Sequence, residues 1–248
     1  SRMAEVLNRV IEKAFRGSAP AQINVPRDYW TQVIDIELPP IVRFERQGGG
    51  KEAIENAAKL LSKAKFPVIL SGAGVVLGGA IDECKKLAEK LDAPVCNGYQ
   101  HNDSFPGSHP LAVGPLGYNG SKAAMELISK ADVVLALGTR LNPFSTLPGY
   151  GIDYWPKKAT IIQVDMNPDR IGLTKKVSVG ICGDAKQVAQ QILDKLSSDA
   201  GNSGREERKN LIHKTKSAWL QTLSGLDHED DDPGTVWNKE ARERDKDR

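Results

Sequence analysis

Hydrophobic residues in the middle of the chain follow two alternating patterns. In one set of segments apolar residues recur every three or four positions, which predicts amphipathic helices at 51–65, 80–91, 121–131 and 184–196. Between them lie short, continuously apolar runs, which predict strands at 67–70, 94–96, 133–137, 160–164 and 177–181. Strands that are apolar on both faces need helices on both sides of a parallel sheet. The pattern therefore predicts a doubly wound α/β domain over about residues 51–197.

The segments on either side of this domain have other patterns. Residues 3–16 have the apolar spacing of a helix, and residues 21–25 form a short β-type run that ends at Pro26. Residues 31–50 contain consecutive prolines and glycines with little periodicity, which is typical of a connector. We therefore place residues 1–30 at the end of a preceding domain.

Beyond residue 197 the chain becomes polar. A helix is predicted at 206–223, and the charged residues after it cannot bury enough apolar surface to fold by themselves. We therefore interpret residues 198–248 as a linker and helix that lead toward a further domain. Residues 1–50 and 206–248 are expected to pack poorly without such partners.

Composition narrows the possible partners. The 34 Lys and Arg residues nearly balance the 32 Asp and Glu residues, for a net charge of +2, which favours neither nucleic acid nor a membrane surface. No apolar run approaches the roughly 20 residues of a membrane span, and the pattern of a signal peptide is lacking, so we expect a cytoplasmic protein. The three cysteines are far apart and fit buried positions better than a metal site.

In a parallel sheet, ligands bind outside the carboxyl ends of the strands. Gly72 and Gly74 follow the first predicted strand there, where glycines let a phosphate approach the backbone. Their spacing is not that of the dinucleotide fingerprint, and no acidic residue stands about 20 positions later. Tight-turn glycines without a ligand explain the pair equally well.

Three charged residues stand at other strand ends. Arg140 could hold a phosphate or carboxylate through two parallel hydrogen bonds, or could form a surface ion pair. Asp165 has the place of an acceptor for ribose hydroxyls, and Asp184 follows the last strand, but either could cap a turn or helix instead. His101 and His109 lie in a long loop with no identifiable nucleophile, so no catalytic residue is assigned.

Several segments resemble thiamine-diphosphate enzymes. Residues 19–28 (APAQINVPRD) are similar to the end of the pyrimidine-binding domain of that superfamily. The middle domain of acetolactate-synthase-like members resembles, in order, PVILSGAG at 67–74, SFPGSHPL at 104–111, ADVVLALGTR at 131–140 and IIQVDMNP at 161–168. Within the superfamily, residues 26–39, 115–120 and 142–144 are most similar to the sulfoacetaldehyde acetyltransferases.

This resemblance implies a fold, a reaction and a cofactor. The reaction is sulfoacetaldehyde plus phosphate giving acetyl phosphate and sulfite, in a homodimer or homotetramer that uses thiamine diphosphate and magnesium to degrade taurine and related sulfonates. The family's cofactor glutamate and its Gly-Asp-Gly motif are expected outside this chain, since Gly183-Asp184 is followed by Ala185. This piece alone is therefore expected to be inactive and to serve mainly as the structural central domain.

The same resemblance implies a remnant nucleotide site. In acetolactate synthases the middle domain binds FAD, and the positions that match its contacts are Gly72, Gly74, Arg140, Asp165 and Asp184. FAD-binding members follow the arginine with further Asp and Arg, whereas here the residues are Leu-Asn-Pro-Phe at 141–144. We therefore expect no FAD, and another anionic ligand, such as an adenine nucleotide, is the better candidate. Two alternatives remain: an acetolactate synthase or glyoxylate carboligase, and a stand-alone nucleotide-sensing domain.

Overall fold

The computed structural model describes residues 2–17, 19–37 and 45–224. The chain divides into two compact units, Ser1–Gln47 and Gly48–Arg248, which are considered separately. None of the described helices combines the length and apolar character that crossing a membrane requires.

The first unit contains the helix α1 (Met3–Gly17) and a short 3-10 helix, η1 (Arg27–Tyr29). The helix confirms the apolar spacing of the sequence, but it buries none of its residues. The predicted strand at 21–25 is wrong, because these residues pair with no other strand in the described part of the chain. A strand needs a neighbour to take up its backbone hydrogen bonds.

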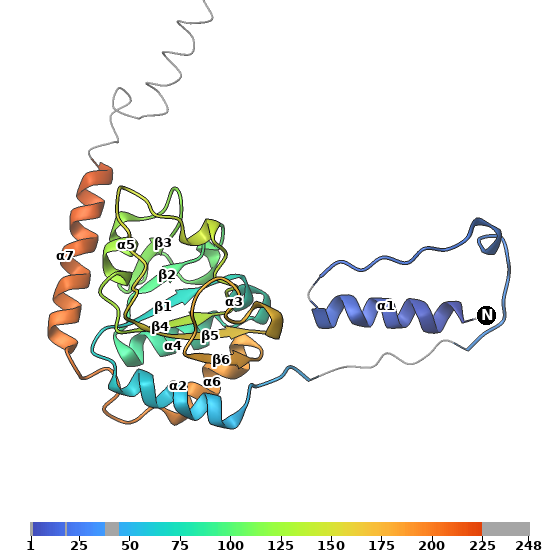
Figure 1. Ribbon diagram of the computed structural model, residues 1–248, viewed down its shortest axis with the longest axis horizontal. Helices are drawn as coiled ribbons and strands as arrows, with labels where there is room; N and C mark the ends of the chain where they lie inside the picture. The colour runs from blue at the N-terminus through green and yellow to red at the C-terminus, as the bar shows by residue number, and fades with distance from the viewer. Residues whose placement is uncertain (1, 18, 38–44, 225–248) are drawn as a thin grey trace, which may run out of the picture. The chain divides into compact units, whose positions relative to one another are not determined.

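The second unit is built on a parallel sheet of six described strands (Figure 1). Their bounds are β1 Pro67–Ser71, β2 Val95–Asn97, β3 Ala112–Pro115, β4 Val133–Leu137, β5 Thr160–Asp165 and β6 Val179–Cys182. The order across the sheet is β3-β2-β1-β4-β5-β6, and every pairing is parallel. The order reverses between β1 and β4, so this sheet has the predicted doubly wound topology.

Helices cover both faces of this sheet. On one face lie α2 (Lys51–Lys63), α4 (Ile81–Leu91) and α6 (Ala185–Lys195), and α6 packs against both of the others. On the other face α5 (Lys122–Ile128) packs against α7 (Arg205–Ser224). The residues of β1 and β4 are all buried between these layers, as their continuously apolar sequences predict.

Two elements were missed by the apolar pattern. A one-and-a-half-turn helix, α3 (Ala73–Gly78), follows β1, and β3 lies within the loop expected at 97–120. Both are too short to show a period, and β3 pairs with β2 across an irregularity between Val95 and Cys96. Tertiary pairing, rather than local propensity, therefore forms the strand.

The expectation that residues after 205 pack poorly is wrong for the first half of α7. Arg208, Ile212 and Thr215 are buried against the domain. The Nζ atom of Lys216 also donates to the carbonyl oxygen atoms of His109 and Pro110. This helix is part of the central domain, whereas the charged tail after Ser224 lies outside the described residues.

Candidate functional site

The sheet brings all five predicted site residues to its carboxyl edge. Gly72 and Gly74 follow β1, Arg140 follows β4, Asp165 ends β5, and Asp184 follows β6. These four strands are neighbours in the sheet. Ser71 is in register with Leu137, and Asp165 is in register with Cys182. The sequence therefore predicted correctly which edge holds them, and their contacts show what each side chain does there.

The two glycines pack against backbone. A Cβ atom on Gly72 would lie 2.6 Å from the Cβ of Thr139, and one on Gly74 would lie 2.7 Å from the Cα of Gly138. The Gly74 N–H donates to the Gly138 carbonyl oxygen at 2.8 Å. Close approach of the β1–α3 turn to the end of β4 is therefore enough to require both glycines, which matches the tight-turn alternative.

The two aspartates have internal partners. A carboxylate oxygen of Asp165 accepts the N–H of Asn167 at 2.8 Å, and one of Asp184 accepts the N–H groups of Lys186 and Gln187 at 3.1 and 3.2 Å. Asp165 thus closes a turn, and Asp184 is the N-cap of α6. The capping roles that the sequence left open are the ones that the contacts support.

Arg140 differs from the other four. Its side chain is exposed, and within the described part of the chain it makes no hydrogen bond or ion pair. Its guanidinium is available to an anion or to a carboxylate of another protein surface.

A buried glutamine, which the sequence reasoning missed, holds the backbone next to Arg140. The Nε2 atom of Gln163 donates to the carbonyl oxygens of Thr139 and Arg170 at 3.1 and 3.2 Å, and its Oε1 accepts the N–H of Gly172 at 2.9 Å. This one amide ties together the loops that follow β4 and β5. A polar residue inside an otherwise apolar strand was the signal that could have found it.

A second polar network fills the carboxyl ends of β1 and β2. The Nδ2 atom of Asn97 donates to Oγ of Ser104 at 2.9 Å, and the hydroxyl of Ser71 donates to the Ser104 carbonyl at 3.1 Å. All three side chains are buried. The network holds the loop 98–104 in place and contains no acid–base pair.

The two histidines of the segment predicted as a loop at 97–120, His101 and His109, do not form a triad either. Nδ1 of His109 accepts the N–H of Leu111, and its Nε2 lies 3.3 Å from a carboxylate oxygen of Glu89. The side chain of His101 makes no hydrogen bond within the described residues. No group of three His, Cys, Asp or Glu side chains in the described residues could hold a metal ion.

The cysteines are predicted to differ in reactivity. Burial raises the pKa of the Cys84 thiol from 9.0 to about 12 and also raises the pKa of the buried Cys96, whereas Cys182 is partly exposed. A pKa raised from 9 to 12 lowers the thiolate fraction at pH 8 by roughly 1,000-fold. Ellman's reagent at pH 8 should therefore titrate one thiol in the native chain and three in urea, and Cys182→Ser should remove the native reaction. Rapid reaction of three thiols in the native chain would contradict this assignment.

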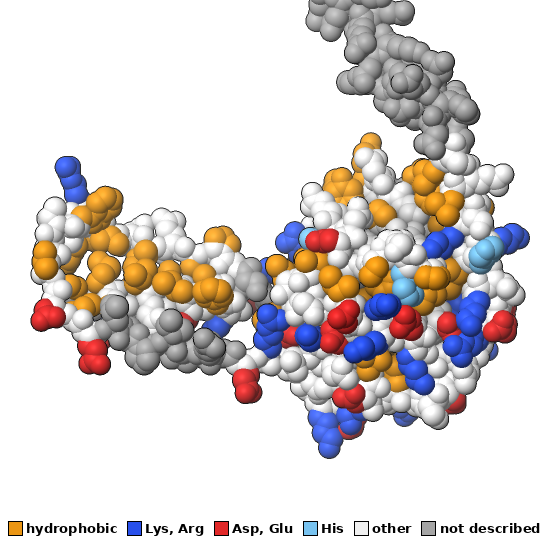
Figure 2. All heavy atoms as spheres, turned by 180° about the vertical axis from the view of Figure 1, so that it is seen from behind, with side chains coloured by type: hydrophobic (Ala, Val, Ile, Leu, Met, Phe, Trp, Pro, Cys, Tyr) orange, Lys and Arg blue, Asp and Glu red, His pale blue; other side chains and the backbone are white. Residues whose placement is uncertain are grey.

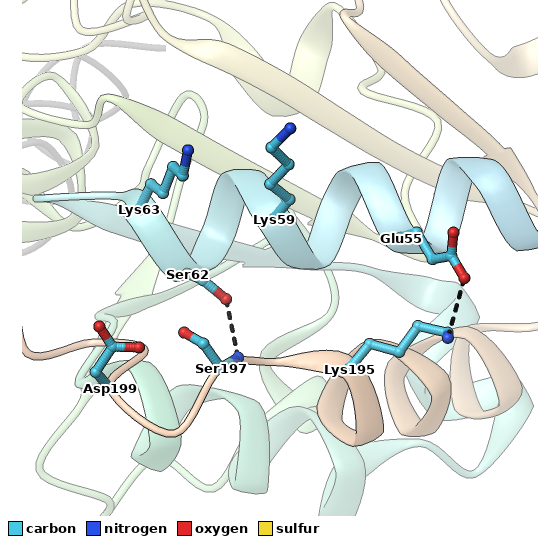
Figure 3. A pocket seen from close by; sticks show the side chains of 7 residues that line it. All are labelled: Glu55, Lys59, Ser62, Lys63, Lys195, Ser197 and Asp199. Atoms are coloured by element: carbon cyan, nitrogen blue, oxygen red, sulfur yellow. Dashed lines mark hydrogen bonds and ion pairs between the residues drawn. The ribbon is translucent and has the colours of Figure 1, made fainter.

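A hollow on the described surface lies away from the carboxyl edge. It has a volume of about 510 Å3 and is lined by residues of α2 and of the segment around the end of α6: Glu55, Lys59, Ser62, Lys63, Lys195, Ser197 and Asp199 (Figure 3). An ion pair between Lys195 and Glu55 and a hydrogen bond from the Ser197 N–H to the Ser62 hydroxyl cross it. These bonds join the two segments across the hollow.

The residues present do not fit thiamine diphosphate with its metal ion. The Gly183-Asp184 pair is the sole part of the chain that is similar to the Gly-Asp-Gly motif, and its carboxylate caps α6. The segment after Arg140 also lacks further charged side chains: Asn142 accepts the N–H of Phe144 at 2.9 Å, and the Phe144 ring packs edge-on against Tyr99. The described side chains, between residues 2 and 224 with the gaps given above, therefore supply no reaction step of their own.

Known proteins similar to this chain are longer. The chain is 78% identical over its full length to the "Probable sulfoacetaldehyde acetyltransferase" of Rhizobium meliloti (strain 1021), and spans 42% of that protein. It is 76% identical over 98% of its length to the sulfoacetaldehyde acetyltransferase of Roseovarius nubinhibens, and spans 40% of that protein. The curated relatives are thus more than twice as long as the part that this chain matches.

A solved structure and a family model agree with the fold. The crystal structure of benzoylformate decarboxylase from Polynucleobacter necessarius superimposes with a TM-score of 0.58 over 72% of this chain and 33% of that one, and at 23% identity it supports the fold alone. The model of the thiamine pyrophosphate enzyme central domain matches residues 54–192, which is more than half of the chain and includes all six described strands. The chain therefore belongs to the thiamine pyrophosphate enzymes, of which it contains the central domain.

Proposed function

We propose that this chain is the central part of a sulfoacetaldehyde acetyltransferase. The observation that carries the proposal is 78% identity along all 248 residues to a longer protein of that name. The longer protein would convert sulfoacetaldehyde and phosphate to acetyl phosphate and sulfite: the carbon–sulfur bond breaks, sulfite leaves, and phosphate takes the acetyl group. Thiamine diphosphate would supply the carbanion chemistry when bound in the longer protein.

In this proposal the chain divides into four parts. Residues 1–30 are the end of the pyrimidine-binding domain, and residues 31–50 connect it to the central domain. Residues 51–197 form the central domain, and residues 198–248 lead toward the diphosphate-binding domain. The packing of α7 on the central domain supports a later boundary than 197, after Ser224. The central domain positions its neighbours and contributes no reacting group.

The longer protein should make acetyl phosphate, and the 248-residue chain should not. We expect the longest polypeptide encoded around this sequence to release equal amounts of acetyl phosphate and sulfite with magnesium and thiamine diphosphate present. Calorimetry should show no thiamine diphosphate binding to the 248-residue chain. Tight, magnesium-dependent binding to the short chain would overturn the proposal, as would a longer protein that condenses pyruvate to acetolactate instead.

The alternatives are less well supported. An acetolactate synthase or glyoxylate carboligase would need FAD contacts, and the residues at 141–144 offer none of the expected charged side chains. A stand-alone nucleotide sensor is disfavoured because the two relatives described above match the whole or nearly the whole chain within a longer enzyme. We further propose that the longer protein uses magnesium, works in taurine breakdown in the cytoplasm, and assembles as a homodimer or homotetramer.

We also propose that Gly72, Gly74, Arg140, Asp165 and Asp184 border an anion site of the adenine-nucleotide class. The free guanidinium of Arg140 supports this, while the other four would shape the site through the turns and caps described above.

The ligand test uses ADP, ATP, CoA and FAD with calorimetry and thermal shift. Arg140→Ala should weaken ADP binding by roughly 10- to 100-fold, the scale of a charge-assisted hydrogen bond. Lys59→Ala, on an exposed helix face, is the control. Stoichiometric FAD, or ADP binding that is equal in the Arg140→Ala variant, would refute the proposed site.

A further inference from the structure

Exposed apolar side chains of the central domain are confined to one edge of the sheet. Between Gly48 and Ser224 the described residues expose nine large hydrophobic side chains. Seven stand in segments that follow the carboxyl end of a strand, and two stand on the last turns of α7: Leu77, Tyr118, Phe144, Leu147, Tyr150, Met166, Leu173, Leu220 and Leu223. The outer faces of α2, α4, α5 and α6 expose none. We call these nine residues the carboxyl-edge surface.

Contacts between the segments join them at the same edge. The hydroxyl of Tyr150 donates to the carbonyl of Gly120 at 2.9 Å, which joins the loop after β4 to the loop after β3. The ring of Tyr150 packs on Trp219, with centroids 5.6 Å apart, so the last turns of α7 lie beside these loops. The hydroxyl of Thr174 donates to the carbonyl of Leu141 at 2.6 Å and so joins the loop after β5.

Several of these side chains are strongly exposed. Leu173 is 72% exposed, Leu77 71% and Tyr118 65%. Single exposed hydrophobic residues are ordinary, but nine of them at one edge, with none on four helix faces, mark an interaction surface. Aromatic side chains with a free arginine, here Arg140, are typical of the centre of a protein interface. In Figure 2 some of the exposed hydrophobic side chains of this domain are seen at its top.

The direction of α7 indicates what covers this surface. Arg208, near the start of α7, bonds to the backbone just before β1, at Lys65, and just before β2, at Asp92. Trp219, near the end of α7, lies at the opposite edge of the sheet. The helix therefore carries the chain from the amino edge to the carboxyl-edge surface, and relatives that contain this chain have more than half of their length outside it.

We propose that the carboxyl-edge surface docks the part of the longer polypeptide that lies outside these 248 residues. The proposal rests on the proposed function, because it requires the chain to be a piece of a longer enzyme. A second copy of the central domain and the first unit of this chain are the competing occupants.

Site-specific photo-cross-linking in the longer protein tests the occupant. Benzoylphenylalanine is placed at Tyr118 and Leu173, two exposed positions on loops that follow different strands, and at Lys59 on α2 as a control. Mass spectrometry should find the partners of positions 118 and 173 in peptides outside residues 1–248, and the control should yield none there. Cross-links to residues 48–224 of a second copy, cross-links to residues 2–37, or yields no higher than the control would overturn the proposal.

A pair of charges gives a second readout. Tyr118→Asp combined with Leu173→Asp should leave the Tm of the 248-residue chain within about 2 °C, since both side chains are already exposed. In the longer protein the same pair should lower Tm by about 5 °C or more, because it buries charges at an interface. Equal shifts in both proteins would count against docking. Neither readout needs sulfoacetaldehyde, so an inactive longer protein with the expected cross-links would refute only the proposed reaction.

Discussion

Arg208→Met should lower the free energy of unfolding of the 248-residue chain by about 4 kcal/mol. The side chain is 1% exposed, although it carries a charge. Its guanidinium donates five hydrogen bonds, all to carbonyl oxygens: those of Lys65, Leu91, Asp92, Gly201 and Ser203. Methionine keeps the apolar volume of the stem but leaves these buried acceptors without a donor, and each unsatisfied group costs about 1–3 kcal/mol without full additivity.

Burial and a neighbouring carboxylate act in opposite directions on the guanidinium of Arg208. Burial lowers the pKa of the guanidinium, and the nearby carboxylate of Asp92 opposes that change. Asp92 also pairs with Arg205 one turn earlier in α7. Arg208→Lys should recover only part of the stability, because an ammonium has three donors and not the planar fork that reaches five carbonyls.

Urea unfolding followed by circular dichroism measures the loss. Lys214→Ala, at an exposed position of the same helix, is the matched control and should change stability by less than about 0.5 kcal/mol. Hydrogen exchange should show loss of protection along α7 in Arg208→Met. A loss under about 1 kcal/mol would mean that α7 is held by its apolar contacts instead.

Gly138→Ala should destabilise the domain by more than about 3 kcal/mol. Gly138 has φ +61°, where an L side chain is strained by roughly 1–2 kcal/mol. Its added Cβ would also lie 2.7 Å from both the Cα of Gly74 and the N of Val75, and neither backbone atom can rotate away. The β1–α3 turn would have to move off the end of β4, at the centre of the sheet.

Gly79→Ala separates the two causes. Gly79 has nearly the same φ, +63°, but a Cβ there would meet nothing within 4 Å. Its alanine variant should therefore lose only about 1–2 kcal/mol, from backbone strain. Thermal unfolding of both variants gives the comparison, with soluble yield as the readout if Gly138→Ala does not fold. Equal losses of stability in the two variants would show that the positive φ, and not the close approach of the backbone, causes the destabilisation.

The amino-acid sequence by itself determined the layers of the central domain. Apolar runs such as 133–137 are predicted as strands because a strand that is buried on both faces must be apolar at every position. β4 has those same bounds. Helices such as 184–196 are amphipathic because they bury one face, and α6 agrees within one residue at each end. These signals are local, so they can be read without knowing the partner.

Long-range contacts were decided only by the tertiary structure. β3 exists because β2 pairs with it, and residues 21–25 form no strand because the described chain offers them none. The sequence placed Gly72, Asp165 and Asp184 at the correct edge but could not choose between ligand contact and turn or cap, since that choice depends on which backbone atoms lie within 3–4 Å. In the sequence, Arg208 is one of several charged residues at the start of a polar helix. Five carbonyls from segments distant in sequence make it a buried anchor, and no periodic pattern records where those carbonyls converge.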